Sequence, residues 1–542
     1  MVLWYAVWLG AVALTFRYLW WLKSILEWKY WFLAMPFFEA ECCILAFFIT
    51  GYSLRLVTLL SKWMKEKKEI KGVSAGNTEF PRILIMIPVC GEPIEEVKKT
   101  VVSMLKIDYP QDRMHVAITD DRGDPLLPEL AAEYGIAYIT HPHHDESKAG
   151  NLNRALAQLR KSFCPDWVLV VDTGDIVDPE IMKSVKPRMG EDKLGFIQVE
   201  RHFSFTGVPL VADFHYFYEV IQPRRDEVGS AFACGSGAFW NVRAIDELGG
   251  FSTWNLVEDL TTSYLLQLRG WHGRYISGKA FHWSEYVPDL PRMIKQRWQW
   301  AIDTYRLFFW KNPFAQKSLS WMLRWDYGEM GLVYLLSFPI LMIRMMPFAL
   351  IWMPTFLFNG HSGALTYWQY FLPVICARMA CEWIQFRRSK VPFVNWKRQQ
   401  SLYEGLMPVF CVAALQTLVM GPNRKPTYHI TGKGVRQGFF WHLIKFQLAW
   451  FFGGVGTVWY GYLASTDVTP ILLTSTVWLI YSLWLLIPFI TAAAATSFWM
   501  FRLIWRCVVI GAFISVLMVL LVELYASPVY SAVEHLIMHY IG

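Results

Sequence analysis

The chain has 542 residues, of which 54% are apolar, 17% aromatic and only 18% charged. This composition excludes a disordered chain, and nine cysteines without a C-x-x-C spacing exclude a disulfide-stapled scaffold. The net charge of +7 comes largely from basic residues beside apolar runs and not from an aromatic-interleaved patch, so no nucleic-acid partner is expected. The first expectation is an integral membrane protein in contact with lipids.

Seven apolar runs approach or exceed the length of about 20 residues that a helix needs to cross a bilayer. They lie near residues 1–22, 34–60, 329–358, 367–386, 439–463, 469–495 and 501–525. The basic segment 62-KWMKEKKEIK-71 follows the second run, which places the long polar region after it in the cytoplasm. The expected divisions are N-terminal spans in 1–61, a cytoplasmic domain in 62–320, spans in 321–390, interfacial helices and a loop in 391–438, and C-terminal spans in 439–542.

The central region alternates short apolar runs with helical patterns. Strands are expected at 83–89, 115–120, 136–141 and 167–172, and helices at 95–107, 129–135 and 152–163. Strands that alternate with helices of this length predict an α/β domain of the nucleotide-binding type with a mostly parallel sheet. In such sheets ligands bind at the carboxyl ends of the strands, so the residues that follow each strand are the candidates for function.

Four polar motifs occur in order along this region. They are 88-PVCGEP-93, 120-DDRGD-124, 147-SKAGNLN-153 and 172-DTGD-175. Carboxylates at such an edge accept hydrogen bonds from a base or ribose, or hold a divalent cation, and Lys148 next to Gly150 suits a diphosphate. A single Asp-Asp turn is often only a loop. Four such motifs in order predict a nucleotide site.

Further motifs follow at 234-CGSGAFW-240, 257-VED-259 and 296-QRWQW-300. The ordered set resembles the membrane-embedded, processive, inverting glycosyltransferases of family 2, the group of cellulose, chitin and hyaluronan synthases. The segment 427-TYHITGKG-434 makes the likeness greatest to bacterial cellulose synthase catalytic subunits, which carry an F-x-V-T-x-K-G gating loop at this place. The resemblance implies a GT-A (Rossmann-like) cytoplasmic glycosyltransferase domain inserted in an α-helical transmembrane domain of about seven spans.

The resemblance also assigns roles to individual residues. Asp259 of VED corresponds to the general base of the family, with Glu258 beside it, and Trp300 to the residue that meets the acceptor sugar. Mg²⁺ or Mn²⁺ is implied as the cofactor, with Asp172 as a ligand. The residues implied for the nucleotide sugar are Glu92, Asp120, Asp121, Lys148, Asp172, Gln296 and Arg297, and those of the gating loop are Thr431 and Lys433.

Two positions depart from the family pattern. The second Asp of the metal-binding D-x-D motif is Gly174, and Asp175 comes one residue later. The metal is therefore expected on Asp172 alone, on Asp172 with Asp175 through a shifted turn, or more weakly than usual. The Arg of Q-x-x-R-W is replaced by Gln299, and Arg297 is the alternative cation, although the two positions point in different directions on a helix.

One histidine cluster and one single histidine are candidate metal ligands, each with a structural alternative. The cluster 141-HPHHDE-146 precedes KAGN, and three histidines in a polar turn are more often solvated than bound to metal. His282 lies shortly before QRWQW, either as a cation ligand or as a structural histidine.

Three functions compete. The first is a processive transferase that extends a β-linked polysaccharide and passes it across the plasma or inner membrane. A cellulose-like glucan made from UDP-glucose is favoured, and accessory export subunits are candidate partners. The second is a non-processive transferase with a lipid acceptor, which needs no gating loop such as TYHITGKG. The third is a non-catalytic scaffold or transporter with a degenerate transferase domain, suggested by Gly174 and Gln299 and opposed by the intact Asp259, Lys148 and Trp300.

Overall fold

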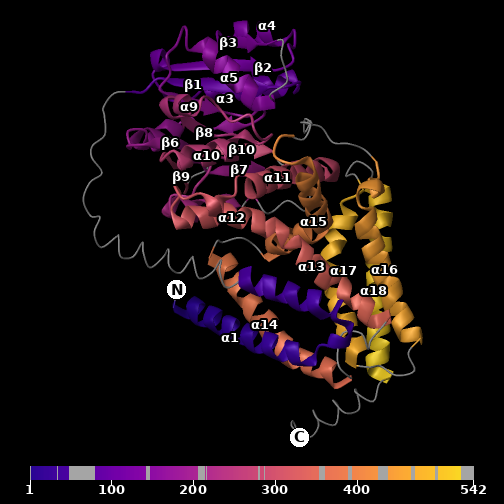
Figure 1. Cartoon of the computed structure of the whole chain (residues 1–542). Coiled ribbons are helices and arrows are strands. Elements are labelled where there is room, and N and C mark those ends of the chain that lie inside the picture. The colour runs from indigo at the N-terminus through magenta and orange to yellow at the C-terminus, as the bar shows by residue number, and fades with distance from the viewer. Residues whose placement is uncertain are drawn as a thin grey trace.

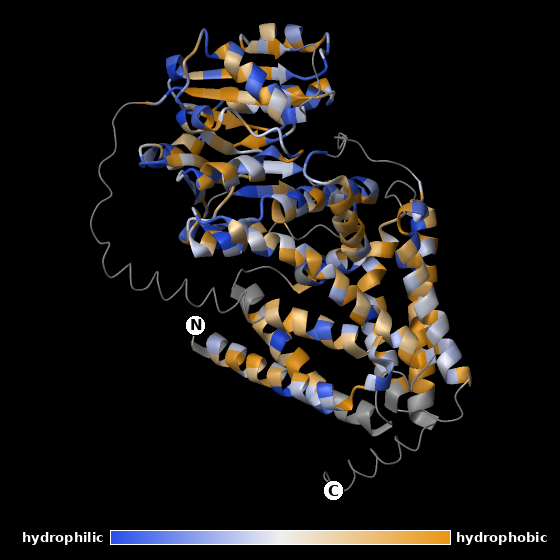
Figure 2. Cartoon of the chain, viewed as in Figure 1, coloured by the Kyte–Doolittle hydropathy of each residue, from blue (hydrophilic) through white to orange (hydrophobic). Residues whose placement is uncertain are grey.

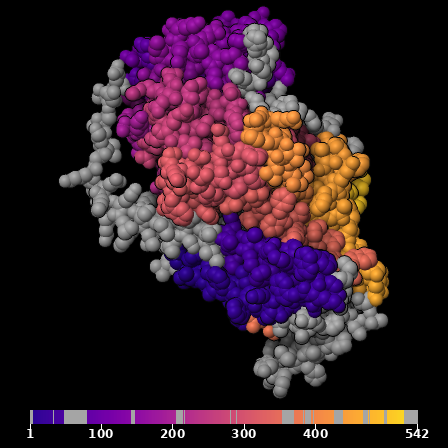
Figure 3. Space-filling model, viewed as in Figure 1, coloured from indigo at the N-terminus to yellow at the C-terminus, as the bar shows by residue number. Residues whose placement is uncertain are grey.

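The computed structural model of the chain describes residues 2–32, 34–47, 80–141, 147–204, 214, 217–278, 281–285, 287, 289–352, 361–388, 393–424, 438–464, 470–494 and 499–526. An α/β domain occupies one end of the molecule and long helices occupy the other (Figure 1). Figure 3 shows the surface of the N-terminal helices, in indigo, on the side away from the α/β domain.

Seven strands form the main sheet of the α/β domain in the order β3-β2-β1-β4-β8-β6-β9. β1 is parallel to β2 and β4, β2 to β3, and β6 to β9, whereas β8 runs antiparallel to both β4 and β6. The predicted parallel half of the sheet is thus confirmed, and the insertion of β8 makes the whole sheet mixed. The strands are β1 Ile83–Val89, β2 Met114–Asp120, β3 Ala137–Thr140, β4 Trp167–Val170, β6 Leu194–Val199, β8 Ala238–Asn241 and β9 His272–Ile276.

Helices cover both faces of this sheet, as the continuous burial of its central strands requires. Ile83, Ile85 and Ile87 of β1 pack in one core with helices α3 and α4, whereas Leu84 and Met86 pack on the other face with α5 and α9. This alternation is the two-residue period of a strand. The helices are α3 Ile94–Leu105, α4 Leu127–Glu133, α5 Ser147–Leu159, α6 Ile181–Val185, α8 Gln222–Glu227, α9 Val242–Leu248 and α10 Glu258–Leu268.

A second sheet of three strands lies in the order β5-β10-β7. Its members are β5 Ile176–Val177, β7 Arg201–Ser204 and β10 His282–Glu285. His282 is opposite Arg201 on one side and Val177 on the other. Because β5 directly follows the DTGD motif, this small sheet brings residues from three distant parts of the chain to that motif.

Long helices build the rest of the molecule. They are α1 Val2–Ile25, a helix over 34–47, α11 Leu290–Trp310, α12 Trp321–Leu335, α13 Ser337–Trp352, α14 His361–Arg388, α15 Phe393–Met420, α16 Lys445–Ala464, α17 Pro470–Thr491 and α18 Trp499–Ala526. α1 packs along α14, where Trp21 stacks on Tyr370 at 4.7 Å between ring centroids. Figure 2 shows that apolar residues dominate many of these helices.

Among the described residues, three helical segments are long and apolar enough to cross a membrane. They are Trp321–Trp352, Phe393–Met420 and Trp499–Val522. The first and third fall on spans that the sequence predicts, and the second lies in the region expected to hold interfacial helices. The count of about seven spans stays a prediction.

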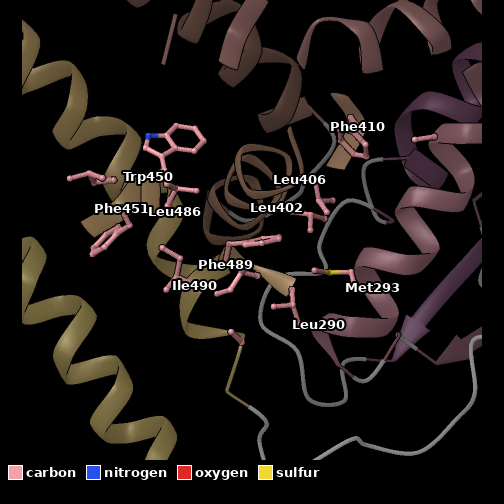
Figure 4. Close-up of a cluster of buried hydrophobic side chains, with 14 of the residues drawn as sticks. Leu290, Met293, Leu402, Leu406, Phe410, Trp450, Phe451, Leu486, Phe489 and Ile490 are labelled. Atoms are coloured by element: carbon pink, nitrogen blue, oxygen red, sulfur yellow. The ribbon is translucent and has the colours of Figure 1, made fainter. Parts of the chain in front are cut away.

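The α/β domain is joined to the long helices through α11. Leu290 and Met293 of α11 share one apolar cluster with Leu402, Leu406 and Phe410 of α15, and this cluster continues into α16 and α17 (Figure 4). All five of these side chains are 1% exposed or less. The packing fixes the position of α15 relative to the helix that carries the QRWQW motif.

Candidate active site

Asp120 at the end of β2 shapes the loop that follows it. Its fully buried carboxylate accepts hydrogen bonds from the Arg122 N–H at 2.8 Å, the Asp124 N–H at 2.6 Å and the Tyr138 hydroxyl at 2.9 Å. These bonds close the DDRGD turn and use both carboxylate oxygens within the protein. The side chain of Asp120 therefore positions its neighbour, Asp121.

Asp121 and Glu92 approach the same point from the ends of two adjacent strands. Oδ2 of Asp121 lies 3.8 Å from Cys90 Sγ, and Glu92 Oε2 accepts a 2.6 Å hydrogen bond from the Cys90 N–H. Oδ1 of Asp121 is 3.7 Å from an Arg154 nitrogen. The two motifs thus meet at one edge of the sheet, where their carboxylates supply acceptors that suit the N–H and O–H groups of a nucleoside.

Lys148 joins three of the predicted motifs. Its ammonium group lies in the first turn of α5, 2.6 Å from Asp172 Oδ1 and 3.3 Å from Glu258 Oε1, with its side chain 20% exposed. Burial acts to lower the pKa of Lys148, but the charges of Asp172 and Glu258 raise it overall. A charged ammonium group is therefore held among the KAGN, DTGD and VED motifs.

Asp259 is a buried carboxylate of the site with a raised pKa. Its side chain is 8% exposed, and Oδ1 accepts a 2.6 Å hydrogen bond from the Leu260 N–H. Burial, followed by the charge of Glu258, raises the pKa of Asp259 to about 8, although Lys148 acts in the opposite direction. A carboxyl group that titrates near neutral pH is suited to take a proton during a reaction.

The loop 234-CGSG-237 approaches this cluster at Gly235, where φ is +82°. A Cβ atom placed on Gly235 would lie 3.1 Å from Asp259 Oδ2, 3.8 Å from Lys148 Nζ and 4.0 Å from Asp172 Oδ2. The three charged groups therefore converge on one glycine. Gln198 holds the loop, since its amide donates to the Ser236 carbonyl at 3.0 Å and accepts from the Cys234 N–H at 2.7 Å.

The two aspartates of DTGD have different surroundings. The Asp172 side chain is 42% exposed, and its backbone N–H donates to Ser236 Oγ at 2.9 Å. The Asp175 side chain is 7% exposed, and its Oδ2 accepts from Ser236 Oγ at 2.6 Å and lies 3.0 Å from His282 Nε2 and 3.4 Å from an Arg201 nitrogen. Burial acts to raise the pKa of Asp175, but His282 and Arg201 lower it overall.

These surroundings bear on the predicted metal. Within the described part of the chain, no group of three His, Cys, Asp or Glu side chains is arranged to hold a metal ion. Asp172 is accessible beside Lys148 and fits a cation that takes one protein carboxylate and completes its shell with phosphate and water, as Mg²⁺ commonly does. The Asp175 carboxylate is already engaged by three partners, and His282 is among them.

The QRWQW motif lies on α11, and its cation faces aromatic rings. The Arg297 guanidinium carbon is 4.4 Å from the centre of the Trp300 ring and 4.6 Å from that of Phe214, and Arg297 is 4% exposed. Gln299 is also buried, at 6% exposed, and Gln296 is half-buried. The structure thus places Arg297 against Trp300.

Two predicted features fall outside the described residues. Thr431 and Lys433 of the expected gating loop lie in 425–437, and 142–146 contain most of the histidine cluster. Their roles stay predictions.

Two supporting residues of the site, Arg201 and Gln198, lie in none of the sequence motifs. Arg201 of β7 and Ser236 of the loop before β8 bind Asp175, and Gln198 of β6 supports that loop. His282 was expected either as a cation ligand or as a structural residue, and it is fully buried beside Asp175. The pairing of β10 with β5 and β7 brings His282 and Arg201 to Asp175.

Part of the chain matches a known protein family. Residues 81–303 match the family profile described as "Glycosyltransferase like family 2". Residues 81–303 thus form a domain similar to the family 2 glycosyltransferases. All the candidate residues that the structure describes, from Glu92 to Trp300, lie within this match.

Curated relatives of the chain are bacterial cellulose synthases. One is cellulose synthase 1 of Komagataeibacter xylinus, 28% identical over 385 residues that cover 67% of this chain and 23% of that protein. Another is the UDP-forming cellulose synthase 1 catalytic subunit of the same organism, 27% identical over 381 residues that cover 66% of this chain and 48% of that protein. The chain thus spans less than half of the length of either relative.

Among solved structures, the mannosyltransferase PcManGT from Pyrobaculum calidifontis, in complex with GDP-Man and Mn²⁺, is 13% identical to the chain. The TM-score is 0.48, and the match covers 70% of this chain and 99% of that one.

Proposed function

We propose that the glycosyltransferase domain extends a β-linked polysaccharide from a nucleotide sugar and that the long helices pass the product across a membrane. The observation that carries this proposal is the convergence of Lys148, Asp172 and Asp259 on Gly235 at the carboxyl edge of the sheet. The names of the relatives, cellulose synthase and a UDP-forming catalytic subunit, favour glucose from UDP-glucose as the donor. The basic segment 62–71 favours a cytoplasmic catalytic domain, and the proposed membrane is an inner or plasma membrane.

The transfer itself is a direct displacement with inversion. The acceptor hydroxyl oxygen forms a bond to the anomeric carbon of the donor sugar while the bond from that carbon to the diphosphate oxygen breaks. Asp259 takes the proton of the acceptor hydroxyl, and the nucleoside diphosphate leaves. Because Asp259 is buried and its pKa is raised, it binds that proton well near neutral pH.

Other residues bind and orient the donor. Lys148 stabilises the negative charge that grows on the diphosphate, and Glu92 and Asp121 accept hydrogen bonds from the nucleoside. Asp172 is the residue that would hold Mg²⁺ or Mn²⁺, and the cation would then offset negative charge on the leaving diphosphate. Glu258 keeps the ammonium of Lys148 in place at 3.3 Å.

The remaining predicted roles complete the cycle. Trp300 presents an aromatic face to the acceptor sugar, with Gln296 and Arg297 on the same helix supporting the donor side of the site. Thr431 and Lys433 reach the diphosphate when their loop closes over the loaded site and withdraw when the nucleotide leaves.

A panel of radiolabelled nucleotide sugars tests this function. Purified full-length chain in lipid nanodiscs is incubated with each donor, and the product is sized and digested with linkage-specific glycosidases. We expect a long product from UDP-glucose even when only a small fraction of the donor has been consumed. A β-glucanase should digest this product, and the Asp259→Asn variant should not form it. A single sugar added to lipid makes the non-processive alternative correct, and no transfer from any donor favours the non-catalytic scaffold.

A double variant tests the gating loop. Thr431→Ala with Lys433→Ala is expected to reduce turnover strongly while the protein stays folded and binds donor, because only closure is lost. Polymer formation at the parental rate would remove the case for gating and weaken that for processive synthesis.

A further inference from the structure

Arg306 of α11 is a buried cation that binds two separate parts of the chain. It is 1% exposed. Its Nε donates to Asn255 Oδ1 at 2.9 Å, and Nη2 donates to the carbonyls of Trp254 at 3.1 Å and Pro422 at 3.3 Å. Nη1 donates to the Gly421 carbonyl at 3.4 Å and to that of Arg424. The N–H donors of the guanidinium are thus divided between residues 254–255 and 421–424.

The first of these parts is the turn that leads into α10. Asp303, one turn before Arg306 on α11, accepts a 2.6 Å hydrogen bond from the Val257 N–H. Asn255 donates to the Asp303 carbonyl at 3.1 Å and to Thr261 Oγ1 at 3.0 Å. α11 therefore holds the turn at 254, 255 and 257, immediately before Glu258 and Asp259 begin α10.

The second part is the C-terminal end of α15. α15 ends at Met420, and Gly421 follows in the left-handed region with φ +69°. The last carbonyls of a helix have no partner within it and carry partial negative charge, so a cation placed there is favourable. Arg306 lies close to this end and donates to the carbonyls that directly follow the helix, those of Gly421, Pro422 and Arg424. One turn earlier on α15, Gln416 accepts a 2.7 Å hydrogen bond from Trp298 of α11.

Arg306 also contacts an aromatic ring of the turn before α10, that of Trp254. Its guanidinium carbon lies 4.7 Å from the centre of the Trp254 ring, and Lys311 Nζ lies 4.8 Å from that centre. A planar guanidinium can serve several carbonyls and stack on a ring at the same time, whereas an ammonium group has three donors and no plane. Lysine is therefore a poor substitute at this site although it keeps the charge.

We propose that Arg306 is a positioning residue that fixes the start of α10, and with it Asp259, relative to the C-terminal end of α15. The effect on sugar transfer rests on the proposed function, but the link between the two segments does not. Within the described part of the chain, α15 is one of the segments long and apolar enough to cross a membrane. The rate of the chemical step then depends on the position of the C-terminal end of α15 relative to the catalytic domain.

Two variants and a matched control test the link. Arg306→Lys keeps the charge but loses the planar fork, and Asn255→Ala removes only the acceptor of Arg306 Nε and the donor to Asp303 and Thr261. The control is Arg324→Lys on α12, where Arg324 also donates to two backbone carbonyls, those of Leu319 at 3.0 Å and Lys317 at 2.9 Å. Thermal unfolding in nanodiscs first shows whether each variant is folded.

Hydrogen exchange supplies a readout that needs no substrate. Arg306→Lys is expected to increase amide exchange in two peptides at once, one over 254–262 and one over 417–424, whereas Arg324→Lys increases exchange only near 317–324. Increased exchange in one peptide alone, or in neither, overturns the link. If Arg306→Lys does not fold, Asn255→Ala is decisive in the same way, with increased exchange expected in both peptides.

Kinetics then separate positioning from general damage. For the active enzyme, Arg306→Lys is expected to lower kcat about 10-fold or more while the KM for the donor changes less than about 3-fold, because misplacing a reacting group by about 1 Å costs up to 10²-fold. An unchanged kcat with increased exchange in both peptides overturns the positioning role. If no donor supports transfer by the parent chain, the proposed function fails and the exchange result still decides the link.

Discussion

The ammonium nitrogen of Lys148 lies 2.6 Å from Oδ1 of Asp172. This pair joins the first turn of α5 to the end of β4, and Glu258 approaches the same ammonium from α10. One positive charge therefore faces Asp172, Glu258 and the nearby Asp259. A diphosphate can bind here only if the Lys148 ammonium group turns toward it and a cation or a proton neutralises part of the negative charge of the carboxylates.

Replacing Lys148 by methionine tests the role of this charge. Lys148→Met keeps much of the side chain but removes the cation, so UDP is expected to bind at least about 10-fold more weakly, since charge-assisted hydrogen bonds to phosphate are among the stronger ones. Isothermal titration with UDP measures the effect. Lys161→Met, at an exposed position beyond the end of α5, is the control, and equal affinity in both variants would contradict the assignment.

Asp259→Asn tests the general base. The amide keeps the shape of the carboxyl group but does not take a proton, so turnover is expected to fall by about 10²- to 10⁴-fold. UDP binding should change little, because the acceptor and not the nucleotide meets this residue. Retention of more than about a tenth of the parental rate would place the base elsewhere.

The raised pKa of Asp259 gives the reaction a defined pH dependence. Because the base must be unprotonated to act, kcat should rise with pH below the pKa of about 8 and level off above it. Glu258 raises this pKa and Lys148 lowers it, so Glu258→Gln should move the rising limb to lower pH and Lys148→Met to higher pH. Profiles measured at saturating donor check both directions, and a limb that does not move in either variant would assign it to another group.

The local sequence predicted the edge of the site well. β1 begins and ends at Ile83 and Val89 as expected, and the carboxylates after β1, β2 and β4 meet where parallel strands end. These features depend on short-range alternation and on a rule for parallel sheets.

The network around Asp175 depends on longer-range pairing. His282 and Arg201 lie far from DTGD in the sequence and reach it only because β10 pairs with both β5 and β7. Similarly, the local sequence predicts Arg306 to be an ordinary polar residue of an amphipathic helix. It is buried because α11 packs against the end of α15. Strand order and helix docking of this kind leave little trace in local patterns.

Gly235 tests the convergence of the charged groups. Gly235→Ala adds a methyl group 3.1 Å from Asp259 Oδ2 at a residue with φ +82°, so the carboxylate must shift and activity should fall about 10²-fold. Gly229→Ala is a matched control, because Gly229 has a similar φ of +74° but open space around its Cβ position. Both variants share the backbone strain, and only Gly235→Ala should lose activity beyond any loss of stability. Equal losses in the two would attribute the effect to strain alone.

Asp175→Asn decides what replaces the second aspartate of the D-x-D motif. Since the Asp175 carboxylate binds Ser236, His282 and Arg201 in a buried site, its neutralisation leaves Arg201 without its charged partner and should destabilise the domain by about 3 kcal/mol. Mn²⁺ affinity in the presence of UDP should then change less than about 2-fold, because Asp172 supplies the carboxylate to the metal.

Asp178→Asn, three residues further on and half-buried, is the control and should change stability by less than about 0.5 kcal/mol. Thermal unfolding and Mn²⁺ titration of the same samples give both numbers. A large loss of Mn²⁺ affinity with unchanged stability would instead make Asp175 the second metal ligand, with its carboxylate leaving His282 when the nucleotide and the cation bind.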